Sequence, residues 1–98
     1  MPLDITEYVN MARDATGAII PVGAEPAPTQ QVNITAGSVQ SAAFGAGARL
    51  ARFHADVACR IEVGPNPTAT ATSKRMAAGQ TEYFGVRPGD RVAVISTT

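Results

Sequence analysis

Apolar and polar residues alternate with a period of two along most of the chain after residue 30. The clearest case is 59–63, where Cys59, Ile61 and Val63 fall on one face and Arg60 and Glu62 on the other. Similar patterns, rich in β-branched or aromatic residues, predict further strands within 32–43, 49–54, 75–76, 81–86 and 91–96. No window longer than about ten residues has helical periodicity. The pattern predicts about six to eight strands in antiparallel sheets with one solvated face.

Turn-forming residues separate these segments. Gly64-Pro65-Asn66-Pro67 ends the strand at residue 63, because proline cannot donate a hydrogen bond to a ladder. Residues 68–73 alternate small and β-branched side chains, which predicts a loop or a weak edge strand. Arg87-Pro88-Gly89-Asp90 predicts the turn of a hairpin between 81–86 and 91–96. We therefore expect an all-β fold, either a small antiparallel β-sandwich or a jelly-roll-like barrel.

The N-terminal thirty residues have a different pattern, which predicts an extended N-terminal arm. Short apolar runs at 8–12 and 18–22 flank a turn-forming cluster, so this part is either a marginal hairpin or an extended segment. A helix near residues 3–12 is the competing interpretation. Pro26 and Pro28 stiffen the segment that follows. We expect residues 1–29 to form an arm and a Pro-rich linker, and residues 30–98 to form the β-sandwich domain.

Composition predicts a single domain with a thin core. The chain has 98 residues, and much of its 45% apolar fraction is alanine, with only 5% aromatic residues and no tryptophan. The larger apolar side chains must therefore provide most of the packing. These are Leu50, Phe53, Ile61, Val63, Phe84, Val86, Val92 and Val94. A short chain with a thin core gains stability by association, so we expect a homo-oligomer or a bound partner.

Net charge and the lack of long apolar runs argue against two classes of partner. Eight basic and eight acidic residues cancel, which removes the electrostatic attraction that nucleic-acid binding requires. Residues 1–7 resemble no secretion signal, and no apolar run reaches membrane-spanning length. We expect neither nucleic acid nor membrane as a partner.

Candidate chemistry is sparse. His54, Asp56, Cys59 and Glu62 are metal-ligating residue types, but their spacing on strands turns them to different faces. Cys59 is the only cysteine, and its alternating neighbours predict a buried core residue rather than a reactive thiol. Gly45-Ala46-Gly47 lacks the third glycine and the following helix of a dinucleotide-binding loop, which leaves a turn. We expect no catalytic residue, no cofactor and no metal, and therefore no enzyme.

Three segments resemble small structural proteins encoded in the head gene clusters of tailed bacteriophages and prophages: 50–56, 59–69 and 82–95. Within them, the Gly64-Pro65-Asn66-Pro67-Thr68-Ala69 turn and the Gly85-Val86-Arg87-Pro88-Gly89-Asp90 motif are distinctive in combination. The resemblance covers about half of the chain and leaves the first forty residues unmatched. It implies a non-enzymatic virion protein, made in the host cytoplasm and located on the capsid surface as a decoration or cement protein.

The partner that this resemblance implies is the major capsid protein. A neutral β domain with a stiffened arm is suited to binding by strand addition and shape complementarity. The residues we expect to contact the partner are Ile5, Tyr8, Ile19, Ile20, Tyr83 and Arg87. The alternative is a binding module of the neck, tail or fibre, including one that binds host glycans.

Overall fold

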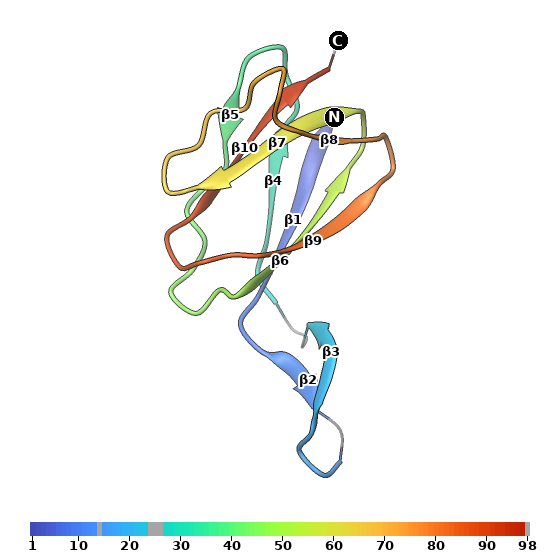
Figure 1. The fold of residues 1–98 in the computed structure, drawn as a ribbon, viewed down its shortest axis with the longest axis vertical. Helices are drawn as coiled ribbons and strands as arrows, with labels where there is room; N and C mark the ends of the chain where they lie inside the picture. Colours follow the sequence, from blue (N-terminus) through green and yellow to red (C-terminus); the bar gives the residue numbers. More distant parts are fainter. Residues whose placement is uncertain (14, 24–26, 98) are drawn as a thin grey trace.

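The computed structural model describes residues 1–13, 15–23 and 27–97, with the backbone alone at 11–13 and 19–23. It is an all-β sandwich of two four-stranded antiparallel sheets with a separate two-stranded hairpin at one end (Figure 1). The first sheet has the order β4-β1-β6-β9: Thr29–Asn33, Pro2–Tyr8, Leu50–Ala55 and Thr81–Gly85. The second has the order β5-β10-β7-β8: Val39–Gln40, Arg91–Ser96, Cys59–Gly64 and Lys74–Met76. The hairpin pairs β2, Met11–Arg13, with β3, Ile19–Gly23. The predicted fold class is confirmed.

The core lies between the two sheets and follows the period-two pattern. Cys59 and Ile61 of β7 are buried at 0% and 1% exposure, whereas Glu62 between its apolar neighbours is exposed. Of the predicted core residues, five are buried and two are half-buried against the core: Phe53, Ile61, Val86, Val92 and Val94, then Val63 and Phe84. Leu50 differs from the prediction, because it is half-buried on the opposite face of β6 from Phe53. Phe53 lies at the centre of the aromatic residues of the core. Its ring centroid is 6.4 Å from that of Phe44 and 5.5 Å from that of Phe84.

The position of strand β1 is the main difference between the structure and the domain organisation predicted from the sequence. Residues 2–8 were assigned to the arm, but they pair with β4 on one side and β6 on the other, inside the first sheet. Leu3 and Ile5 are buried at 0% and 1% exposure, while Asp4 and Thr6 between them face outward. This alternation is that of a strand, so the helix considered near residues 3–12 is wrong. The arm begins only after Tyr8, and the sandwich includes the start of the chain.

The predicted hairpin around Arg87-Pro88-Gly89-Asp90 is also wrong. β9 pairs with β6 in the first sheet, whereas β10 pairs with β7 and β5 in the second. The turn is real, since Gly89 has a φ of 85° and the Asp90 N–H donates to the Arg87 carbonyl at 3.1 Å. Its role is to carry the chain from one sheet to the other, with Val86 buried at the crossing.

The segment after β4 forms less strand than predicted. Only Val39 and Gln40 pair with β10 as a strand. The next residue, Ser41, is buried and bonds β10 through its side chain as well as its backbone. The Ser41 N–H donates to the Val92 carbonyl at 2.8 Å, and the Val92 N–H donates to Ser41 Oγ at 3.0 Å. Residues 68–73 form a loop, which is one of the two predicted outcomes.

Candidate docking site at the hairpin end

The β2–β3 hairpin extends from one end of the sandwich, while both chain termini lie at the opposite end (Figure 1). Within the described residues its strands pair with each other and with neither sheet. The molecule is accordingly elongated, with principal extents of 48 × 25 × 20 Å. Gly17, with a φ of 86°, supplies the left-handed residue of the hairpin's exposed turn. An isolated two-stranded hairpin is marginally stable in water, so this element is suited to pairing with another surface.

A buried carboxylate fixes the point where the chain leaves the sandwich for the hairpin. Glu7, at the end of β1, is only 8% exposed. Its Oε1 accepts a hydrogen bond from the Gly45 N–H at 2.7 Å, and its Oε2 accepts one from Gln30 Nε2 at 3.3 Å. The Glu7 N–H also donates to the Pro28 carbonyl at 2.9 Å. The departing and returning segments are therefore joined to each other and to loop 44–48.

Backbone hydrogen bonds bring a second loop to the same end. The Arg49 N–H donates to the Tyr8 carbonyl at 3.0 Å, and the Val86 N–H donates to the Arg49 carbonyl at 2.9 Å. The Phe44 N–H donates to the Asp90 carbonyl at 2.8 Å, which ties loop 44–48 to loop 86–90. We call the hairpin together with loops 44–48 and 86–90 the hairpin end.

Val9 packs over Gly47 at this end. A Cβ added to Gly47 would lie 2.8 Å from Cγ1 of Val9, so a larger residue at 47 would force the Val9 side chain to move. Val9 is nevertheless 48% exposed, which leaves an apolar surface beside the hairpin.

The structure brings some of the predicted contact residues to the hairpin end and separates others. Arg87 is exposed in loop 86–90, and Tyr8 lies at the base of the hairpin with a side chain only 8% exposed. Ile19 and Ile20 belong to β3, and their side chains lie outside the described part. Ile5 differs from its predicted role, because its side chain is in the core and unavailable to a partner. Tyr83 is 57% exposed but lies on the outer face of the first sheet.

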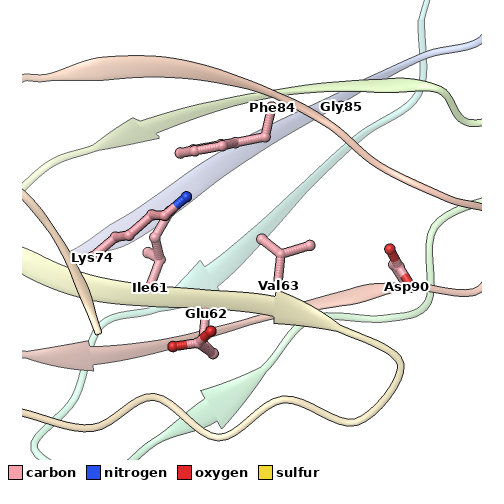
Figure 2. Close-up of a pocket in the computed structure, with 7 residues that line it drawn as sticks. All are labelled: Ile61, Glu62, Val63, Lys74, Phe84, Gly85 and Asp90. Atoms are coloured by element: carbon pink, nitrogen blue, oxygen red, sulfur yellow. The ribbon is translucent and has the colours of Figure 1, made fainter. Parts of the chain in front are cut away.

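A cleft opens between the two sheets on the flank formed by β8 and β9 (Figure 2). Its volume is about 250 Å³, and Ile61, Val63 and Phe84 form its apolar walls. The Lys74 ammonium lies 5.0 Å from the centroid of the Phe84 ring, a cation–π contact between two residues that line the cleft. Glu62 points away from the cleft in Figure 2 and accepts a hydrogen bond from Ser73 Oγ at 2.9 Å. The Lys74–Phe84 and Ser73–Glu62 contacts join neighbouring segments around the cleft, and the residues that line it do not form a recognisable catalytic site.

The titratable residues noted in the sequence do not converge. His54 and Asp56 lie at the end of β6 and just beyond it, Cys59 faces the core, and Glu62 is on the outer face of β7. In the described ranges, no group of three or more His, Cys, Asp or Glu residues is arranged to hold a metal ion. Burial raises the pKa of the Cys59 thiol, and the positive charge of Arg75 offsets part of that effect. The expectation of a buried, unreactive Cys59 is confirmed as far as its burial is concerned.

Comparison with known proteins identifies no relative: no family model, no curated protein and no solved structure matches this chain. A search of the described residues finds no helix with the length and apolarity needed to cross a membrane.

Proposed function

We propose that this protein is a non-enzymatic structural protein of a tailed-bacteriophage virion, which binds the major capsid lattice as a decoration or cement protein. The hairpin end is the observation that carries this proposal. It presents a paired strand segment outside the sandwich, on a base held by the Glu7 hydrogen bonds. The resemblance of residues 50–56, 59–69 and 82–95 to phage head-cluster proteins supports the same assignment.

The physical properties of the hairpin end favour a protein partner. In the described part of the chain, β2 and β3 pair only with each other, and their outer edges are suited to strand addition, in which backbone hydrogen bonds provide affinity without a charged surface. The chain has no formal net charge, so long-range attraction contributes little and shape complementarity must dominate. Val9 at the start of the hairpin and the exposed Arg87 of loop 86–90 offer the apolar and charged groups that interfaces commonly combine.

A binding module of the neck, tail or fibre is the second candidate. The observation that favours it is the exposed Tyr83 on the outer face of the first sheet, which offers a second binding surface. Copy number distinguishes the two locations. A lattice decoration requires hundreds of copies per virion, whereas a ring at the neck or tail requires about a dozen or fewer. Quantitative mass spectrometry of purified virions measures this number.

Co-sedimentation with purified capsids of the phage or prophage that encodes the chain tests the docking site. The test variant replaces residues 10–26 with a short Gly-Asn-Gly turn. Because the Glu7 N–H and the Pro28 carbonyl are already hydrogen-bonded, the shortened connection is compatible with the sandwich. Lys74→Ala, on the flank of the second sheet, is the matched control.

We expect the wild-type protein and the Lys74→Ala variant to sediment with capsids and the shortened variant to remain in the supernatant. A far-ultraviolet spectrum and a cooperative melt of the shortened variant show that the loss is not caused by unfolding. Capsid binding that survives removal of the hairpin would refute the docking site, and absence of the wild-type protein from purified virions would refute the proposed function.

A further inference from the structure

The outer face of the first sheet carries two aligned rows of polar side chains, one residue from each strand. Leu3, Ile5 and Phe53 of β1 and β6 point into the core, so the residues between them in sequence point outward. The strand register defines the first row as Gln31, Asp4, His54 and Thr81. It defines the second row as Thr29, Thr6, Arg52 and Tyr83. We call these two rows the outer face.

Hydrogen bonds within the first row hold its side chains in place. Gln31 Nε2 donates to Asp4 Oδ1 at 2.7 Å, and His54 Nδ1 lies 2.8 Å from Thr81 Oγ1. Residues on the strands of a sheet also have fixed backbones. The first row is therefore ordered before any ligand arrives, which lowers the entropic cost of binding.

The second row contains the groups that are free to bind. Among the residues that the structure describes, none forms a hydrogen bond or ion pair with the Arg52 guanidinium or with the Tyr83 hydroxyl. Arg52 is half-buried, and Tyr83 beside it is 57% exposed. A guanidinium with five donors and an accessible aromatic ring thus lie on neighbouring strands in direct register.

Several of these polar groups line a hollow in the outer face. It has a volume of about 510 Å³, and its polar lining consists of Asp4, Thr6, Thr29, Gln30, Gln31 and Arg52. That volume falls within the range of about 300–1,000 Å³ that is typical of small-ligand sites. Arg52 lies at the border of the hollow, and Tyr83 on β9 comes next to it.

From this arrangement we infer that the outer face binds a neutral saccharide. Sugar hydroxyls both donate and accept hydrogen bonds, and the face offers donors at Arg52, an acceptor at Asp4 and groups of both kinds at Thr6 and Gln31. The accessible ring of Tyr83 provides an apolar surface for the C–H face of a sugar ring. Four strands span about 14 Å, which accommodates a short oligosaccharide.

Charge and position argue against other ligands. An anionic ligand attracted to Arg52 would meet the Asp4 carboxylate across the hollow, and a cationic ligand attracted to Asp4 would meet Arg52. An extended peptide binds at a strand edge, where backbone groups are unpaired, whereas β1 and β6 are interior strands with both edges paired. The proposal does not rest on capsid docking, because its residues lie on the strands of the first sheet and not on the hairpin, although the hollow borders the hairpin base at Gln30.

Titration monitored by ¹⁵N-¹H NMR tests the saccharide site with defined probes. The neutral probes are cellotetraose, maltotetraose, mannotetraose and chitotetraose, and tetragalacturonate is the acidic one. We expect at least one neutral probe to shift the backbone resonances of Arg52 and Tyr83, with a Kd near or below about 1 mM. Resonances of β7 and β8 in the second sheet should not move.

Tyr83→Ala and Arg52→Gln should each weaken binding of that probe about ten-fold or more. Arg75→Gln on β8 in the second sheet is the matched control and should bind as the wild type does. Thermal melting of each variant separates loss of the site from loss of the fold. The inference is overturned if no neutral probe shifts the outer face at about 10 mM, if tetragalacturonate alone binds, or if Tyr83→Ala binds unchanged.

Discussion

At the scale of single residues, Cys59 combines burial with a raised pKa. Its side chain is 0% exposed, and burial raises the pKa of the thiol because the thiolate loses its hydration. We expect the native protein to react with a thiol reagent at pH 8 only as fast as it unfolds, since the reagent cannot reach the sulfur. Labelling measured across a urea series should follow the fraction unfolded. Rapid labelling without denaturant would contradict the buried location.

The same thiol predicts a pH dependence of stability. Because the folded pKa lies above the unfolded value of about 8.5, the unfolded state loses its proton first as the pH rises. The free energy of unfolding should therefore fall as the pH rises above about 8.5 in the wild type. Urea denaturation at several pH values measures it, and Cys59→Ala is the control in which this part of the decline disappears. Equal slopes in the two proteins would contradict the assignment.

Glu7 makes a second prediction at this scale. Glu7→Ala removes a carboxylate that is only 8% exposed and accepts hydrogen bonds from the Gly45 N–H and from Gln30 Nε2, so we expect a loss of about 1–3 kcal/mol in unfolding free energy. Glu7→Gln retains an acceptor oxygen and should lose less. Asp56→Ala, at an exposed position, should stay within about 0.5 kcal/mol of the wild type. Chemical denaturation compares the three variants. An unchanged unfolding free energy in Glu7→Ala would show that the hydrogen bonds of the Glu7 carboxylate do not stabilise the fold.

At the scale of elements, the period-two pattern predicted most strands but not their partners. The 59–63 alternation was sufficient to assign β7 and its inward residues, since burial in a strand depends on local sequence. By contrast, a Pro-Gly-Asp turn serves a hairpin and a crossing between sheets equally well, so local chemistry did not reveal that β9 and β10 separate. The row that joins Thr6, Arg52 and Tyr83 depends on a register between distant segments, which no local pattern encodes.

Two isoleucines that the sequence assigned to one arm should behave in opposite ways. Ile5→Ala removes a side chain that is 1% exposed in the core, and it should cost about 2–5 kcal/mol of unfolding free energy. Ile20→Ala alters β3, which pairs only with β2 in the described part of the chain, and it should leave the stability of the sandwich nearly unchanged. Thermal and urea denaturation distinguish them. Similar losses for both would mean that the hairpin is part of the cooperative core.

At the scale of the whole molecule, a thin core and unpaired sheet edges favour association. β4, β9, β5 and β8 end the two sheets, and unpaired edges are sites where further strands add. We expect the 10.1 kDa chain to form a homo-oligomer. Light scattering coupled to size-exclusion chromatography measures the mass across a concentration series. A mass that remains at 10.1 kDa throughout would contradict this expectation.

The placement of the two chain ends has a practical consequence. The Met1 carbonyl accepts a hydrogen bond from the Ile34 N–H at 2.9 Å, and the Thr35 carbonyl accepts one from the Ser96 N–H at 2.7 Å. The beginning of β1 and the end of β10 are thus neighbours, at the end of the sandwich farthest from the hairpin (Figure 1). A fluorescent protein or an antigen fused at either terminus would lie at the end of the sandwich opposite the hairpin. If the hairpin docks as proposed, a fused cargo would be displayed on the side that faces away from the docking surface.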